Sequence, residues 1–214
     1  MNQVFKTGIG TRDPKSTIGM PGEGGMVALI LPPNWWVIPL GGPVLVKKRI
    51  REIVAARIGK DEKFAEMRTR IRTDLEKAAT MAADAGYTQV VVFAMDLANV
   101  SISGSMLNRQ NPALTPDSAD DIAAAIAHAN PLAQVVSDTF DGGWVVRSIK
   151  ETEIERTDPE GNPILPELRV EYTIFKEGLG GMDLVYFTPF VTLKEPLVDL
   201  FDAVTLSMHR VVAG

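Results

Sequence analysis

The side chains that most often carry out catalysis are few and scattered in this chain. Its 214 residues include no cysteine and only two histidines, His128 and His209. The lack of cysteine excludes thiol catalysis, cysteine-ligated metal centres and disulfides. Each histidine lies near the end of a predicted helix, where an imidazolium interacts favourably with the helix dipole. Because neither has a second ligand or a base near it in sequence, neither indicates a catalytic or metal centre.

The serine, glycine and acidic motifs also lack the sequence context that catalysis, phosphate binding or metal binding requires. Ser103-Gly104-Ser105 falls inside an alternating strand pattern, whereas a hydrolase nucleophile requires a strand-to-helix turn. The glycine-rich stretches 8–10 and 22–25 do not join a strand to a helix, as a phosphate-binding loop does. Residues 117–121 place aspartates at a predicted helix N-terminus, and residues 151–155 place glutamates along one solvated strand face. The sequence therefore predicts no catalytic, cofactor-binding or metal-binding residue.

Positive charge is concentrated between Lys47 and Arg72. This segment has ten Lys/Arg and four Asp/Glu, a net charge of +6, in a chain with a formal net charge of −5. It spans two predicted helices whose apolar stripes leave the basic side chains largely on the outer faces. Such a pattern is typical of a solvated helix surface with i,i+4 ion pairs. It is also typical of a surface for an acidic protein, a nucleic-acid backbone or an anionic membrane.

The proline-rich stretch 31–40, Leu-Pro-Pro-Asn-Trp-Trp-Val-Ile-Pro-Leu, marks a corner of the predicted core. The prolines end a buried strand over 26–31 because they cannot donate to a β-ladder. Adjacent side chains of an extended segment point to opposite faces, so one tryptophan is expected inside and the other toward the surface. The candidate partner contacts are these tryptophans and the basic side chains that follow: Trp35, Trp36, Lys48, Arg51, Arg68, Arg70 and Arg72.

The order of predicted elements indicates an α+β fold. Residues 1–25 read as a flexible Gly/Pro-rich arm, and 26–214 as a single α/β domain. Helices are expected over 45–58, 61–85, 117–129 and from 196 onward. Strands are expected over 26–31, 35–40, 89–97, 100–106, 133–139, 144–156, 168–174 and 182–193. Because the last third is a meander of strands without βαβ alternation, the sequence predicts a mostly antiparallel sheet packed against helices.

Two motifs carry a resemblance to known proteins: the stretch 31–40 before a helix, and Pro-Leu-Val-Asp-Leu-Phe-Asp-Ala-Val over 196–204 as the closing helix. They resemble a group of uncharacterised actinobacterial proteins. They also resemble the PsbP-like fold, shared by a Ran-binding import factor, LpqN-type lipoproteins and Eag-type secretion adaptors. The likeness covers about residues 26–211. It implies a PsbP-like sandwich that binds other proteins, with no shared catalytic residues.

The resemblance and the lack of a catalytic constellation favour a non-enzymatic protein-interaction module, an adaptor or chaperone-like factor with an acidic partner. The lipobox cysteine of the lipoprotein members is missing, and no signal peptide or membrane-length apolar run is visible, so we expect a cytoplasmic location. One alternative is a small-molecule binder or enzyme whose site is assembled from Asp96, Arg109, Arg147 and Tyr172. Another is weak binding of nucleic acid or an anionic surface through helices 45–85. The oligomeric state stays open.

Overall fold

The computed structural model describes residues 16–22, 25–97, 100–152 and 166–211. Two sheets are formed. The strands are β1 (Ser16–Gly22), β2 (Gly25–Leu31), β3 (Trp35–Pro39), β4 (Gln89–Leu97), β5 (Val100–Gln110), β6 (Gln134–Phe140), β7 (Gly143–Thr152), β8 (Glu167–Lys176), β9 (Gly180–Thr188) and β10 (His209–Val211). The helices are α1 (Pro43–Ile58), α2 (Ala65–Asp84), α3 (Ala119–Ala129) and α4 (Lys194–Leu206), with short 3₁₀ turns η1 (Glu62–Phe64) and η2 (Val191–Leu193).

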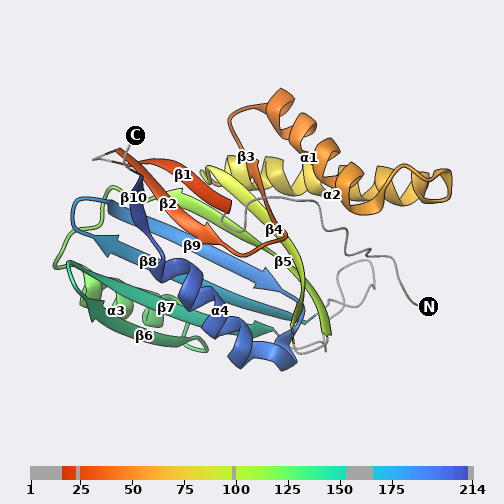
Figure 1. Ribbon diagram of the computed structural model, residues 1–214. Helices are drawn as coiled ribbons and strands as arrows, with labels where there is room; N and C mark the ends of the chain where they lie inside the picture. The colour runs from red at the N-terminus through yellow and green to blue at the C-terminus, as the bar shows by residue number, and fades with distance from the viewer. Residues whose placement is uncertain (1–15, 23–24, 98–99, 153–165, 212–214) are drawn as a thin grey trace.

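The larger sheet has seven strands in the order β3-β4-β5-β9-β8-β7-β6, and the smaller has the order β1-β2-β10. Every neighbouring pair is antiparallel. The small sheet and α4 lie on one face of the large sheet, and the other helices lie toward its opposite face and ends (Figure 1). The α+β class with an antiparallel sheet packed against helices, predicted from the sequence, is therefore confirmed.

The inner face of the large sheet, toward α4 and the small sheet, holds the main core. Trp35, Phe93, Tyr186 and Phe201 form its centre, with Trp35 stacked on Phe93 at 4.5 Å between ring centroids. Position 104 in this layer requires glycine, because an added Cβ would stand 2.4 Å from the Phe93 ring and from the Phe187 carbonyl oxygen. The Ser-Gly-Ser motif of the sequence is thus explained by close packing.

Among the described residues, helices cover the outer face at its two ends. At one end, α1 and α2 pack on Ile38 and Val90 of β3 and β4, which form a second core cluster with Ile50 and Val54. At the other end, α3 packs over β6 and β7. The central strands β5, β9 and β8 lie between these two helical covers on that face.

Several boundaries differ from those expected. Residues 16–22, predicted as part of a flexible arm over 1–25, form β1 and pair with β2 along their whole length; residues 1–15 and 23–24 lie outside the described residues. The strand expected over 182–193 ends at Thr188, because Pro189 has no amide donor and η2 follows. The end of the strand expected over 144–156 lies outside the described residues beyond Thr152.

Candidate functional site

A groove of about 980 Å³ runs between the α1–α2 hairpin and the outer face of the large sheet. Its volume lies at the upper end of the roughly 300–1,000 Å³ that is usual for ligand pockets. Its walls come from α1, α2, β4 and β5, with β3, β8 and β9 contributing at the margins. The main apolar contacts of the groove are Trp36, Ile71, Leu75, Ala78, Met81, Val92, Leu107 and Phe187.

The roof of the groove is the apolar stripe of α2. Ile71, Leu75, Ala78, Ala82 and Ala85 recur at three- or four-residue steps, which places them on one face of the helix. Toward the C-terminal end of α2 the stripe consists of alanines, which are too short to fill the space down to the sheet. Met81, at the margin, is 63% exposed. The small residues of this stripe therefore leave the groove open.

The floor of the groove is the outer face of β4, β5 and β9. Val92 pairs with Ser105, and Ser105 pairs with Phe187, so these three side chains form one row across the sheet. Leu107 lies one pleat further along β5. Two walls of regular secondary structure thus define the groove, which favours a fixed shape.

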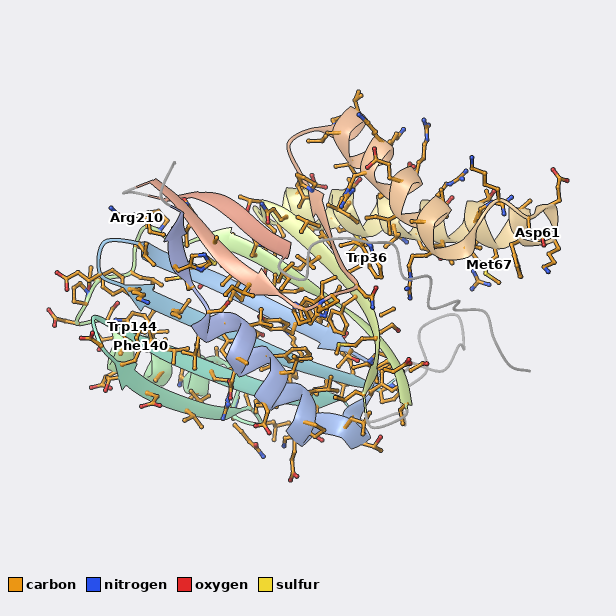
Figure 2. The ribbon with its side chains drawn as sticks, in the orientation of Figure 1. Trp36, Asp61, Met67, Phe140, Trp144 and Arg210 are labelled. Atoms are coloured by element: carbon orange, nitrogen blue, oxygen red, sulfur yellow. The ribbon has the colours of Figure 1, made fainter. Side chains whose placement is uncertain are left out.

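The turn that joins the two helices of the hairpin is held by Arg68. Its Nη1 donates hydrogen bonds to the carbonyl oxygens of Gly59 at 3.2 Å and Asp61 at 2.6 Å. The tip of the hairpin around Asp61 and Met67 extends beyond the sheets, while Trp36 lies near its base (Figure 2). Arg68 therefore orients α2 over the sheet and is occupied in this structural role.

Three arginines lie over three of the four aromatic side chains that line the groove, and Phe93 is the fourth. Arg57 lies 4.5 Å from the ring centroid of Trp36, and burial lowers the pKa of Arg57 while the charge of Asp96 opposes that shift. Arg109 and Arg169 lie 5.3 Å from the rings of Tyr87 and Phe187, respectively. Cation–π contacts of this kind combine a flat apolar surface with a nearby donor group.

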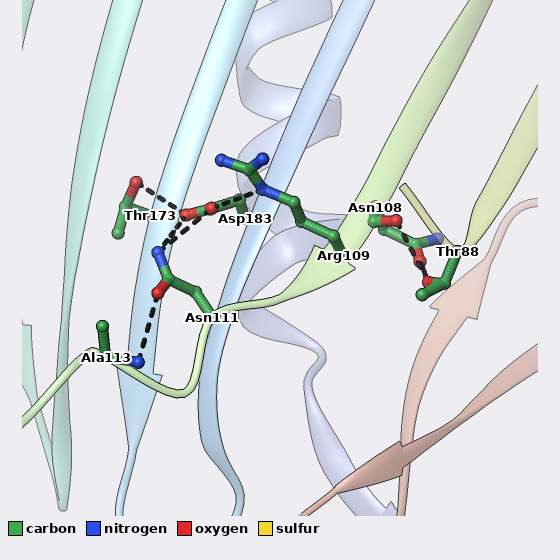
Figure 3. A network of polar contacts seen from close by, with 7 residues as sticks. All are labelled: Thr88, Asn108, Arg109, Asn111, Ala113, Thr173 and Asp183. Carbon is green, nitrogen blue, oxygen red and sulfur yellow. Dashed lines mark hydrogen bonds and ion pairs between the residues drawn. The ribbon is translucent and has the colours of Figure 1, made fainter. Parts of the chain in front are cut away.

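A polar network joins β5, β9 and β8 on the outer face (Figure 3). Asp183, which is 8% exposed, accepts hydrogen bonds from Arg109 Nε at 2.9 Å, Asn111 Nδ2 at 3.1 Å and Thr173 Oγ1 at 3.1 Å. Burial raises the pKa of Tyr87, which lies beside Arg109. The network fixes Arg109 beside Tyr87, which lines the groove, and the Asp183 carboxylate accepts from three side chains.

Of the four residues eligible for a dispersed enzyme site, Arg147 and Tyr172 meet on the inner face. Asp202 of α4 accepts a hydrogen bond from the Tyr172 hydroxyl at 2.7 Å and pairs with Arg147. Asp96 instead accepts from Ser101 at 2.6 Å, and Arg109 belongs to the network on the outer face. The four residues therefore do not form one site, and the Arg147–Asp202–Tyr172 cluster attaches α4 to the sheet.

The structure separates the predicted partner contacts. Trp35 is buried in the core at 3% exposure, so it is unavailable to a partner in the folded chain, whereas Trp36 lines the groove. Lys48 and Arg51 are exposed on α1 away from the groove, and Lys48 borders a smaller pocket beside β3. Arg70 is exposed on α2 and pairs with Asp74 at 4.0 Å.

Arg72 is half-buried on α2, and its Nε has no hydrogen-bond partner among the described residues. The predicted basic surface and the groove are thus on different parts of the hairpin. The sequence did indicate the α2 stripe, but the gap beneath it depends on tertiary packing.

The histidines do not form a site. His128 is exposed in the last turn of α3, as expected, but His209 begins β10, where its Nδ1 lies 2.8 Å from the Ser207 carbonyl oxygen. Within the described part of the chain, no group of three or more His, Asp or Glu is placed to hold a metal ion. Among the helices described, none has the length and apolar character needed to cross a membrane.

No protein-family model and no curated protein sequence matches this chain. The structure is similar to the solution structure of cyanobacterial PsbP (CyanoP) from Synechocystis sp. PCC 6803. The TM-score is 0.44 at 12% sequence identity, over 96% of this chain and 97% of that chain. This likeness concerns the arrangement of elements alone. Membership of the actinobacterial group suggested by the two sequence motifs stays a prediction.

Proposed function

We propose that this chain is a protein-interaction module that holds an amphipathic helix of a partner protein in the groove beneath the α1–α2 hairpin. The observation that carries the proposal is the groove itself: about 980 Å³ of mainly apolar space that the described residues leave partly open to solvent between the hairpin and the sheet. An amphipathic helix placed in such a groove buries side chains at positions i, i+3, i+4 and i+7. The adaptor or chaperone-like role predicted from the sequence would then depend on this surface.

Among the described residues, the rim of the groove favours a protein segment over a fully enclosed small ligand. Pockets for small molecules usually bury about 70–90% of their ligand, whereas the described residues leave this groove partly open to solvent beside the exposed side chain of Met81. Methionine adapts its shape to different apolar partners and is common at protein surfaces that bind helices. Ser103 and Ser105 on the floor supply hydroxyls for polar positions of the bound segment.

The charge of the hairpin indicates the sign of the partner's net charge. Residues 43–84 contain eleven Lys/Arg and seven Asp/Glu, a net charge of +4, which leaves −9 for the rest of the chain. Lys47, Lys48 and Arg51 are exposed on α1. Charge of one sign at an interface raises the association rate of a partner of opposite sign, and salt weakens the effect. A partner helix with a net negative charge should therefore associate faster, although Lys48 and Arg51 do not line the groove.

Two alanines of α2 allow a matched test. Ala78 lines the groove, whereas Ala83 lies on the same helix outside it, and both are exposed. We expect Ala78→Trp to fill the groove and weaken binding of an amphipathic helix at least about tenfold, since displaced apolar contacts cost about 1.4 kcal/mol or more. Ala83→Trp should leave binding unchanged. The probe is a synthetic helix of about 18 residues, or five turns, with leucines in one stripe and glutamates elsewhere; fluorescence anisotropy measures its binding.

A second peptide with lysines in place of the glutamates tests the charge argument. It should bind more weakly than the acidic peptide, and added salt should reduce the difference. Equal binding of the acidic peptide to the Ala78→Trp and Ala83→Trp variants would contradict the proposal. A failure of both peptides together with saturable, Ala78→Trp-sensitive binding of a fluorescent apolar dye would instead support a small-molecule binder. A cytoplasmic location belongs to the same proposal and is tested by cell fractionation.

A further inference from the structure

The two edge strands of the large sheet are protected to very different degrees. At one edge, β3 has five residues and ends in Pro39, and the Val37 carbonyl oxygen accepts a hydrogen bond from Arg49 Nε of α1 at 2.8 Å. At the other edge, β6 has seven residues, Gln-Val-Val-Ser-Asp-Thr-Phe, without proline, lysine or arginine. Natural edge strands usually carry such residues or a cover to prevent pairing with another chain.

The β6 edge also carries exposed apolar side chains. Val136 is 49% exposed, and Leu132, in the turn before the strand, is 91% exposed. Within the described residues, β6 pairs with β7 alone, and Figure 1 shows it at the free margin of the sheet with α3 behind it. Both the backbone and these side chains are therefore available to a second strand.

We propose that β6 pairs with β6 of a second copy of this chain, which joins the two large sheets into one. This inference concerns a surface separate from the groove and does not depend on the proposed function. A twofold axis perpendicular to the sheet makes the two β6 strands antiparallel and keeps the inner faces of both copies on the same side. Residues that face each other must then point to the same face of the sheet, so their numbers are both odd or both even. One residue of β6 therefore faces its own copy across the axis, and the axis is described below as passing through that residue.

The side chains select Val136 as the residue on the axis. In that register Val136 faces its own copy, Leu132 faces Phe140, and Gln134 faces Asp138. An axis through Asp138 would place two aspartates opposite each other, which is unfavourable because their charges are alike. An axis through Ser137 would place the apolar Val136 opposite the charged Asp138, which is also unfavourable. The Val136 register is the one that brings the exposed valines together.

This register also matches the charges along the inner face. Lys194 of α4 donates to Gln134 Oε1 at 3.2 Å and pairs with Glu151 at 2.6 Å. Because Gln134 would face Asp138 of the second copy, that carboxylate would lie beside the Lys194 ammonium, and the twofold axis repeats the arrangement. Oppositely charged groups at an interface help to fix its register.

The outer face leaves room for the second copy. Helix α3 contacts both β6 and β7, so it lies over the gap between them. With strands about 4.8 Å apart, the two copies of α3 would stand about 10 Å apart, close to the usual distance between packed helices. Beyond Asp120 and Asp121 in its first turn, the exposed residues of α3 are Ala124, Ala125, Ala127, His128 and Ala129. The small alanine side chains permit such an approach.

Since the chain has no cysteine, single-cysteine variants test the register directly. Facing side chains in an antiparallel pair have Cβ atoms about 4.5–5.5 Å apart, near the range of about 3.5–4.5 Å for disulfides. We expect Val136→Cys to form a covalent dimer under mild oxidation. The two copies of Ser137 would be two positions out of register, so their Cβ atoms would be too far apart for a disulfide. Ser137→Cys should therefore cross-link at least about tenfold more slowly. Non-reducing electrophoresis measures both.

Sedimentation velocity of the unmodified chain over a range of concentrations provides the second measurement. We expect a reversible dimer, and Val136→Lys should raise its dissociation constant at least about tenfold because two lysines would face each other. Val100→Lys adds the same charge at another half-exposed strand valine and should leave the dimer unchanged. A chain that stays monomeric at all concentrations, or cross-linking that is equal for Val136→Cys and Ser137→Cys, would overturn the proposal.

Discussion

The two faces of the large sheet differ in how closely their covering elements pack. On the inner face, the ring of Phe201 from α4 stacks on Tyr186 at 4.3 Å and meets the edges of Phe93 and Trp35 at 6.0 and 6.5 Å. On the outer face, α2 covers the central strands only partly and leaves the groove of about 980 Å³. Apolar area already buried on the inner face stabilises the fold, whereas the apolar area that remains open on the outer face is available to a partner.

The polar groups of the two faces differ in the same way. On the inner face, the Tyr186 hydroxyl lies 3.1 Å from Thr205 Oγ1, and Asp202 binds Tyr172 and Arg147, so α4 is fixed to the sheet. On the outer face, the guanidinium groups of Arg109 and Arg169 lie over aromatic rings and are partly exposed. Under the proposed function, substitutions on the inner face should change stability and those on the outer face should change binding.

The largest expected effect comes from a pair of phenylalanine substitutions, one on each face. Phe201→Ala should lower the free energy of unfolding by about 3–5 kcal/mol, because it leaves a cavity in a closely packed aromatic cluster. Phe187→Ala, in the floor of the groove, should cost about 1 kcal/mol, because this half-buried ring loses less buried area. Urea denaturation followed by tryptophan fluorescence measures both. Equal losses would show that the outer face is as tightly packed as the inner.

An intermediate effect is expected from the pH dependence of stability. Burial raises the pKa of Tyr172 above its ordinary value of about 10, and the hydrogen bond to Asp202 adds to the shift. The folded state therefore keeps this phenol neutral. Its contribution to stability is fully present below about pH 10 and is lost at higher pH, where the unfolded state ionises, at about 1.4 kcal/mol per pH unit. Burial raises the pKa of Tyr186 in the same direction.

Tyr172→Phe should therefore reduce the alkaline loss of stability above pH 10 by about 1.4 kcal/mol per pH unit. At neutral pH it should cost about 1–2 kcal/mol, because Asp202 loses a donor. The control on the outer face is Tyr87→Phe: Tyr87 is half-buried at the mouth of the groove, and most of the alkaline slope should remain. Guanidinium titrations at pH 7 and at several values above pH 9 measure these slopes. An unchanged slope in Tyr172→Phe would refute the assignment.

Much of the fold could be predicted from the sequence because its strongest patterns are local. β4 begins and ends where expected, at Gln89 and Leu97, because a continuous apolar run is bounded by polar residues and turns. The α2 stripe of Ile71 and Leu75 likewise predicted the helix. β1 was missed because its glycines and proline oppose strand propensity, while pairing with β2 stabilises it through the backbone.

The candidate site was predicted only in part, for a physical reason. Trp36 was identified as a candidate contact, but a sequence does not indicate which of two adjacent tryptophans faces the core. Arg68 carries the same charge as Arg70, yet it donates to two carbonyl groups at the hairpin turn. Asp202 joins Arg147 and Tyr172 across 55 and 30 residues of chain. Such long-range contacts follow from the tertiary arrangement, which local periodicity does not specify.

The smallest effect on stability is expected at the margin of the groove. Met81 is 63% exposed on α2 and contacts the groove without filling it. Met81→Gln keeps the length and helix propensity of the side chain, so the free energy of unfolding should change by no more than about 0.5 kcal/mol. Binding of the acidic amphipathic peptide should nevertheless weaken, because the substitution replaces an adaptable apolar contact with a polar amide. Thermal denaturation and anisotropy of the same preparations measure the two quantities.

The matched control for this last prediction is Leu206→Gln, at the end of α4. Leu206 is also a largely exposed apolar residue of a helix, at 53%, but it lies on the inner-face helix away from the groove. Its substitution should leave both stability and peptide binding nearly unchanged. If Met81→Gln and Leu206→Gln weakened binding equally, the peptide would be responding to general surface hydrophobicity. A loss of binding confined to Met81→Gln would locate the peptide on the outer face. A substitution there can weaken binding without destabilising the fold, because α2 does not pack closely on the sheet.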